Sequence, residues 1–128
     1  MEVEKFLRDG KIYIWKETFD IIKSRKAYPN AFANIRDKND ITVVIKQGKY
    51  NKKDAIKIQK NWKILTFDMV LPFDLIGFFA RISNFMAKEK ISIFTVSAYS
   101  TDHILIKKKD LPKAKRKLEA LGFNVEEK

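Results

Sequence analysis

Two short stretches of the sequence carry groups that could recognise a small charged molecule. Leu71–Ile76 opens a segment with helical periodicity, and the first backbone N–H groups of a helix can bind a carboxylate, helped by the helix dipole. Gly77 has no Cβ and lets a ligand approach the backbone closely. Thr101–Asp102 lies at a predicted turn, where an ionised Asp102 suits an ammonium group. Together the two stretches match the two charged ends of an amino acid.

Each of these residues also has an ordinary structural explanation, which stays open at this stage. Gly77 could allow a helix to pack closely on a sheet, and Asp102 could cap its own turn. Asp74 is better explained as the N-cap of the following helix than as a ligand contact.

The residues that must position these groups lie between Trp62 and Phe123, where helical and strand-like patterns alternate. The first predicted helix begins at about Asp74 and ends near Lys88–Lys90. Its apolar residues recur every three or four positions, on one stripe of a helix. They are Leu75, Phe78, Phe79, Ile82, Phe85 and Met86.

A hairpin and a second helix follow in the same stretch. Ile91–Ser97 is rich in β-branched and aromatic residues and predicts a strand, Ser100–Asp102 predicts a turn, and Ile104–Ile106 predicts the returning strand. Asp110 is placed to cap a helix that Gly122 ends. With a strand before the first helix and another after the second, the order is βαββαβ, an α+β, ferredoxin-like arrangement.

Several of these segments resemble the ACT domain, in particular small tandem-ACT proteins related to animal cytosolic arginine sensors. The similar segments follow the family's order and spacing over about half of the chain. Ala98 and His103 depart from the pattern, which usually has Thr and an aromatic residue there. The segments are Pro72–Gly77, Ile91–Phe94, Ser97–Asp102, His103–Ile106, Asp110–Leu111 and Leu121–Phe123.

The resemblance implies a ferredoxin-like ACT domain at about 62–128 and a degenerate ACT-like half at 1–61. It also implies a non-catalytic regulatory protein that binds an amino acid at an interface between ACT domains, as a homodimer and without a cofactor. The residues it places at the ligand are Leu75, Ile76, Gly77, Phe78 and Asp102, with Thr101 as a neighbour. Leu75 and Phe78 also lie on the apolar stripe, so a core position is the alternative for both. A ligand-free dimerisation module is a further alternative, because ACT-like folds can lose the ligand.

The amino-terminal half has weaker patterns. Lys11–Trp15 alternates as a short strand, and Glu17–Lys26 has a weak helical pattern through Phe19, Ile22 and Ser24. Phe32–Arg36 and Ile41–Lys46 predict a hairpin across an Asp- and Asn-rich turn, and they resemble the amino-terminal half of the same tandem-ACT branch. Lys52–Lys60 fits either a short helix or an extended segment.

The composition excludes several kinds of chemistry. The 128 residues include no Cys and a single His, His103, so the chain offers no thiolate, no Cys-based zinc site and no nucleophile with its base. The apolar stretch Leu71–Phe85 is interrupted by polar residues, which is not typical of a membrane span. Because no signal-peptide pattern follows Met1, we expect a cytoplasmic protein.

The charge balance favours a different function. Lys and Arg number 27 against 16 Asp and Glu, a net charge of +11, and seven of the cations lie in Lys107–Lys117. A basic ferredoxin-like domain can bind nucleic acid, which is the alternative from another class. The aromatic signature of RNA-recognition strands is absent, so a solvated Lys-rich helix face is the simpler explanation.

Overall fold

The computed structural model describes residues 3–73 and 75–128, which form two compact units. The larger unit combines the chain up to Lys16 with Lys63–Lys128, and the smaller unit is Glu17–Trp62. Residues 3–16 therefore pack with the carboxyl-terminal part of the chain. The assignment of 1–61 as a degenerate ACT-like half and 62–128 as the ACT domain stays a prediction.

The larger unit has the predicted βαββαβ order, with one additional strand. Within it the strands are ordered β6-β7-β5-β1-β8, and β1 runs antiparallel to β5 and parallel to β8. The predicted strand at Lys11–Trp15 is thus inserted between the first and last strands of the βαββαβ unit. The elements are α1 (Val3–Asp9), β1 (Lys11–Ile14), the end of β5 (Ala55–Phe67), α2 (Phe78–Lys88), β6 (Ile93–Ser97), β7 (Asp102–Lys107), η2 (Lys108–Asp110), α3 (Leu111–Leu121) and β8 (Asn124–Glu127).

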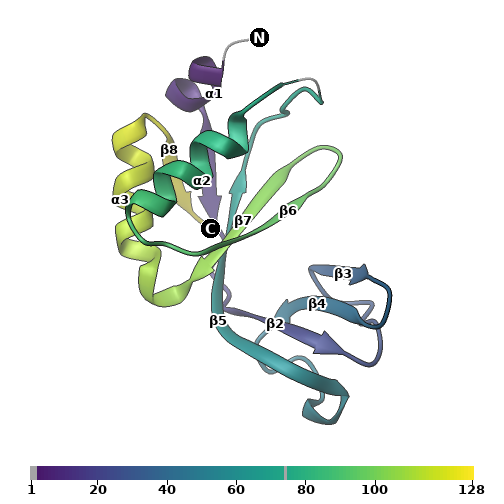
Figure 1. Cartoon of the computed structure of the whole chain (residues 1–128). Coiled ribbons are helices and arrows are strands. Elements are labelled where there is room, and N and C mark those ends of the chain that lie inside the picture. The colour runs from purple at the N-terminus through teal and green to yellow at the C-terminus, as the bar shows by residue number, and fades with distance from the viewer. Residues whose placement is uncertain (1–2, 74) are drawn as a thin grey trace. The chain divides into compact units, whose positions relative to one another are not determined.

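The core of the larger unit lies between its helices and one face of its strands (Figure 1). Phe67 on β5 is fully buried, and its ring contacts those of Phe78, Phe79 and Phe123 at centroid distances of 5.2, 5.8 and 5.7 Å. The apolar stripe predicted for the first helix faces this core through Phe78, Ile82 and Met86. Aromatic packing therefore fixes the amino-terminal end of α2 against the sheet.

The prediction that the first helix begins at about Asp74 is wrong. Helix α2 begins at Phe78, after Gly77 in a left-handed conformation with φ = +88°. Asp74, the predicted N-cap, lies outside the described residues. The stretch before α2 is instead turned by a backbone hydrogen bond of 3.0 Å from Leu75 N–H to Pro72 O. Pro72 restrains the residue before it to extended conformations, which favours a loop here.

The remaining predictions for the carboxyl-terminal part hold closely. Strands β6 and β7 form an antiparallel hairpin, in which Ser97 pairs with Asp102 and a hydrogen bond of 3.0 Å from Ala98 N–H to Thr101 O closes the turn. Helix α3 starts directly after Asp110 and ends at Gly122, whose φ of +115° matches the predicted C-cap. Asp110 is the N-cap residue, as predicted, but its side chain makes no capping hydrogen bond.

The smaller unit is built from strands. The predicted hairpin is confirmed as β3 (Ala33–Arg36) and β4 (Ile41–Lys46), while Lys52–Lys60 forms the short helix η1 (Lys52–Asp54) and the start of β5. Its strands are ordered β3-β4-β2-β5. The helix predicted over Glu17–Lys26 is wrong, because this stretch contains strand β2 (Phe19–Ser24) with Asp20, Ile22 and Ser24 buried in alternation.

Among the helices of the described part of the chain, none has the length and apolar character needed to cross a membrane.

Candidate functional site

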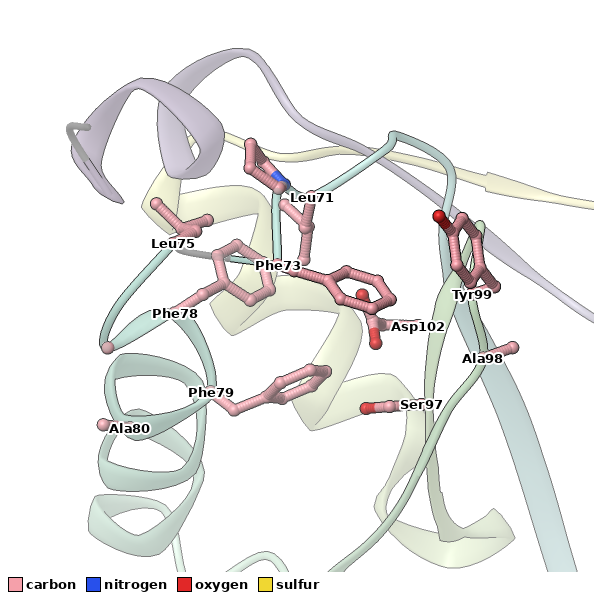
Figure 2. Close-up of a pocket in the computed structure, with 12 residues that line it drawn as sticks. Leu71, Phe73, Leu75, Phe78, Phe79, Ala80, Ser97, Ala98, Tyr99 and Asp102 are labelled. Atoms are coloured by element: carbon pink, nitrogen blue, oxygen red, sulfur yellow. The ribbon is translucent and has the colours of Figure 1, made fainter.

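A cavity of about 570 Å³ opens at the start of α2 in the larger unit. Its walls come from the loop before α2, the first turn of α2 and the β6–β7 hairpin (Figure 2). We call it the aromatic cavity. It is lined by Leu71, Pro72, Phe73, Leu75, Gly77, Phe78, Phe79, Ala80, Ser97, Ala98, Tyr99 and Asp102.

The helix start at the aromatic cavity can accept an anion. The first hydrogen bond into the helix joins Arg81 N–H to Gly77 O at 3.0 Å, so the N–H groups of the preceding turn have no acceptor within α2. No side chain of the described residues caps this end. Phe78, Phe79 and Ala80, which carry these N–H groups, all line the cavity. A bound carboxylate would therefore meet free donors and the positive end of the helix dipole.

A carboxylate lies at another wall of the same cavity. Asp102 is the first residue of β7 and is half-buried. Figure 2 shows its carboxylate directed into the cavity, together with the Ser97 hydroxyl. In the described part of the chain, no hydrogen bond or ion pair involves the Asp102 carboxylate. Its alternative role as a cap of its own turn is therefore not observed, and the carboxylate is placed to meet a cation.

Four of the six predicted site residues border the aromatic cavity: Leu75, Gly77, Phe78 and Asp102. Phe78 is also almost fully buried, so it serves the core as well as the cavity wall. Ile76 points to solvent and is 85% exposed, and it does not line the cavity. Thr101 does not line it either, and its hydroxyl lies 3.2 Å from His103 Nε2.

The structure also separates the two explanations for Gly77. A Cβ built at Gly77 would meet nothing within 4 Å, so close packing of helix on sheet does not require glycine here. The positive φ does require it, since residues with a Cβ disfavour that conformation. The same open space leaves room for a ligand beside the backbone.

His103, the single histidine, belongs to a buried polar chain next to the cavity. Its Nδ1 lies 2.8 Å from Thr66 Oγ1, and Thr66 Oγ1 accepts a hydrogen bond of 2.8 Å from Trp15 Nε1–H. Burial lowers the pKa of His103, and the neighbouring Asp102 carboxylate opposes this effect. The imidazole is thereby held in its neutral form at neutral pH.

Sequence reasoning did not assign three of the aromatic residues in the cavity wall. Phe79 was seen only as part of the apolar stripe, and Phe73 and Tyr99 were seen only within the matched segments. Phe73 and Tyr99 come from opposite walls, and their rings are 5.0 Å apart at 54°. Both are largely exposed, at 78% and 83%. An aromatic residue in each of two solvent-facing loops was the signal that could have found them.

A second, different hollow lies in the smaller unit, and we call it the lysine concavity. Its volume is about 670 Å³. Tyr28 donates a hydrogen bond to the Asp54 carboxylate, which holds the pKa of Asp54 below its usual range. Tyr50 donates a hydrogen bond of 2.6 Å to the buried Asp20 carboxylate. The concavity is lined by Lys26, Tyr28, Gly48, Lys49, Tyr50, Asn51, Lys52, Lys53 and Asp54.

Comparison with solved structures shows the same fold in other proteins. A protein from Agrobacterium tumefaciens superposes with a TM-score of 0.79 at 20% identity, covering 94% of both chains. A Vibrio cholerae protein of unknown function superposes with a TM-score of 0.75 at 16% identity, covering 94% of this chain and 95% of the other. A putative carboxyl-terminal regulatory domain of aspartate kinase from Porphyromonas gingivalis gives a TM-score of 0.61 at 15% identity, covering 90% and 98%.

A search of curated proteins finds no match to this sequence. The model of one protein family, described as ACT domain, matches residues 57–120. The match contains the end of β5, α2, the β6–β7 hairpin and most of α3, and so includes every wall of the aromatic cavity. The recognition made from the sequence is confirmed at the level of the family. This chain belongs to the ACT domain family, and its fold is also that of the putative aspartate kinase regulatory domain.

Proposed function

We propose that this protein is a non-catalytic regulatory protein that binds an amino acid in the aromatic cavity. One observation carries the proposal: the N–H groups at the start of α2, which no described side chain caps, and the Asp102 carboxylate border the same cavity. The helix start suits the α-carboxylate, and Asp102 suits the α-ammonium group. The cavity of about 570 Å³ is within the size range of small-molecule sites.

The ligand contacts in this proposal are Leu75, Gly77, Phe78 and Asp102, with Phe79 and Ala80 added for their backbone N–H groups. Ile76 stays a predicted ligand residue, and Thr101 stays a predicted neighbour of the ligand. The described lining residues include one aliphatic hydroxyl, that of Ser97, and one carboxylate, that of Asp102, but no His, Lys or Cys. This set favours binding over nucleophilic catalysis. The cytoplasmic location expected from the sequence stays a prediction, and cell fractionation tests it.

A screen of the twenty amino acids by thermal shift tests the proposal. A ligand at a hundred times its Kd stabilises the folded state by about 2.7 kcal/mol, which raises the melting temperature by several degrees. We expect Asp102→Asn to weaken binding about 10- to 100-fold, since a charge-assisted hydrogen bond contributes about 1.5–3 kcal/mol.

Asp110→Asn is the matched control for Asp102→Asn. Asp110 lies in η2 of the same unit, makes no side-chain capping hydrogen bond and is not part of the cavity. The control variant should bind as the parent does. A screen in which no amino acid raises the melting temperature would contradict the proposal, and equal weakening by both variants would remove Asp102 from the site.

The homodimer expected from the sequence is part of the same proposal, with a second copy covering the mouth of the aromatic cavity. Val70, Phe73, Ile76 and Tyr99 are exposed large apolar side chains in the two segments that border this mouth. Exposed apolar patches of this kind are typical of interaction sites. Ile76→Lys, at the most exposed of the four, should shift the protein from dimer to monomer in analytical ultracentrifugation. A parent that sedimented as a monomer with and without amino acid would contradict this arrangement.

Nucleic-acid binding is the second candidate, and the lysine concavity is the observation that favours it. Lysines and two tyrosines around one hollow could take a phosphate backbone and stack bases. The cation-rich segment singled out from the sequence is a weaker candidate, because Lys113 bonds the Glu89 carbonyl oxygen at 2.9 Å and Lys117 pairs with the Glu89 carboxylate at 3.7 Å.

Fluorescence anisotropy with a single-stranded RNA at several salt concentrations tests this candidate. Replacing Lys49, Lys52 and Lys53 with Glu should abolish salt-dependent binding, whereas replacing Lys113, Lys115 and Lys117 with Glu changes the same number of charges on α3 and is the control. Absence of binding by the parent at low salt would exclude this candidate.

A further inference from the structure

Apart from the two polar ends assigned above and the Ser97 hydroxyl, the side chains that line the aromatic cavity are mostly apolar. Rings of Phe73, Phe78, Phe79 and Tyr99 surround the space in Figure 2, with Leu71 and Leu75 beside them. Asp102 is the one charged group among the described lining residues. A side chain entering this space therefore meets carbon surfaces, on which an uncharged apolar group is favoured.

No cation is available in the wall segments to pair with an acidic ligand side chain. The stretches 70–80 and 97–102, which supply all the walls, contain no Lys, Arg or His. Arg81, the next residue along α2, has its guanidinium bonded to Glu4. An aspartate or glutamate side chain bound here would lose its hydration without gaining a partner, and this is strongly unfavourable.

A basic ligand side chain faces a similar difficulty. Binding an α-ammonium group already uses Asp102, and no second carboxylate is seen among the described lining residues. Among the described lining residues, a lysine or arginine would find a charged partner for only one of its two cationic groups. Cation–π contacts with the rings would replace only part of the stabilisation that a carboxylate partner provides.

The aromatic pair at the mouth adds to the preference for an apolar group. Phe73 and Tyr99 expose most of their ring surface, and they contact each other from opposite sides of the opening. A bulky apolar side chain placed against these rings removes ring surface from water, whereas a small one such as that of alanine leaves most of it exposed.

From these observations we infer that the ligand is an amino acid with a large uncharged apolar or aromatic side chain. The inference rests on the proposed function, because it assigns the two ends of the ligand to α2 and Asp102 as above. It goes beyond that function by excluding acidic and basic amino acids and by assigning selectivity to the Phe73–Tyr99 pair.

A homologous series of unbranched amino acids measures the apolar contribution directly. Calorimetric titration with alanine, 2-aminobutyrate, norvaline and norleucine should show Kd falling about fourfold for each added methylene, the equivalent of about 0.8 kcal/mol. Phenylalanine, leucine and methionine should bind more tightly than alanine. Aspartate, glutamate, lysine and arginine should bind more weakly than norleucine, by at least tenfold.

The outcomes separate this inference from the function on which it rests. If a charged amino acid binds most tightly, or if Kd does not change along the series, the inference is wrong and the amino-acid-binding function stands. If none of the amino acids binds, both are wrong.

Variants at the mouth connect the selectivity to the two rings. The double variant Phe73→Ala with Tyr99→Ala should reduce the dependence on chain length to less than twofold per methylene, with little change in the affinity for alanine. Both side chains are largely exposed, so folding should be preserved. Ile35→Ala, at an exposed apolar residue of the smaller unit that borders neither the cavity nor its mouth, is the control. An unchanged dependence in the double variant would remove the pair from the inference.

Discussion

The aromatic cavity and the lysine concavity are similar in volume but offer opposite chemistry. The first has mostly apolar lining side chains, a single described carboxylate and a helix start that no described side chain caps. The second is bordered by four lysines, and its two tyrosine hydroxyls already bond to Asp20 and Asp54. The smaller unit, Glu17–Trp62, contains 11 cations and 5 acids, a net charge of +6 on 46 residues. By subtraction from the chain total of +11, the other 82 residues have a net charge of +5.

The two hollows differ in which of their polar groups already have hydrogen-bond partners. In the lysine concavity, the tyrosine hydroxyls and the carboxylates that they contact are already hydrogen-bonded to each other. The lysines therefore leave an excess of positive charge that faces water. In the aromatic cavity, backbone donors and one carboxylate face each other across exposed rings. Groups without partners beside exposed apolar surface are typical of a ligand site, whereas solvated lysines are common on protein surfaces. The comparison therefore favours the aromatic cavity as the functional centre.

The largest effect should come from removing the aromatic support beneath that cavity. Phe67→Ala should lower the free energy of unfolding by about 3–5 kcal/mol, because the ring is fully buried against three other phenylalanines. Phe73→Ala, at an exposed ring of the mouth, should change it by less than about 0.5 kcal/mol. Urea denaturation measures both. Similar losses for the two variants would show that the mouth is part of the core.

Replacing one carboxylate in each unit, Asp20 in the smaller and Asp102 in the larger, should give the next largest difference. Asp20 is buried and accepts hydrogen bonds from Tyr50 Oη, Gln47 Nε2 and the Asn61 backbone N–H at 2.6, 2.8 and 3.1 Å. Asp20→Ala should therefore cost about 2–3 kcal/mol of stability, since buried donors lose a charged acceptor. Asp102→Ala should cost less than about 0.5 kcal/mol, because its carboxylate has no partner in the described part of the chain. A large loss of stability in Asp102→Ala would make that residue structural.

Replacing either of two comparable glycines should have a smaller effect on the free energy of unfolding. Gly77 borders the aromatic cavity and Gly48 the lysine concavity, and both have a positive φ with nothing within 4 Å of an added Cβ. Replacing either with Ala should cost about 1 kcal/mol, because the strain of the left-handed conformation is the same. Only Gly77→Ala should also weaken amino-acid binding in a titration. Weaker binding in both variants would mean that the loss reflects general destabilisation.

The smallest expected effect is the pH dependence contributed by His103. Burial, partly opposed by Asp102, lowers the pKa of this group in the folded state below its ordinary value of 6.5. The unfolded chain therefore binds a proton first as the pH falls, so the histidine contribution to stability is complete above about pH 6.5 and is lost below it. Comparing the parent with His103→Gln by thermal unfolding between pH 5 and pH 8 should show a shallower decline in the variant. Parallel profiles would contradict this assignment.

The sequence predicted the carboxyl-terminal elements well because their signals are local. Asp110 and Gly122 mark the ends of α3, and β-branched and aromatic residues mark the β6–β7 hairpin. Strand β2 was mistaken for a helix because Asp20 interrupts its apolar alternation. That carboxylate is accommodated by donors 27 to 41 residues away in the sequence, which no local pattern contains. The later start of α2 likewise depends on the conformation of Gly77 rather than on apolar spacing.

The candidate site was predicted only in part, again because local sequence patterns do not contain contacts between distant residues. By itself, the sequence determined the family, the βαββαβ order and four residues of the cavity wall, since motif order and residue type are properties of the chain. Tertiary structure alone decided that Asp102 faces the start of α2 and that Phe73 meets Tyr99. It also turned Thr101 toward His103 and Ile76 toward solvent. These outcomes depend on the direction of side chains across separate elements, which folding fixes through packing between residues distant in the sequence.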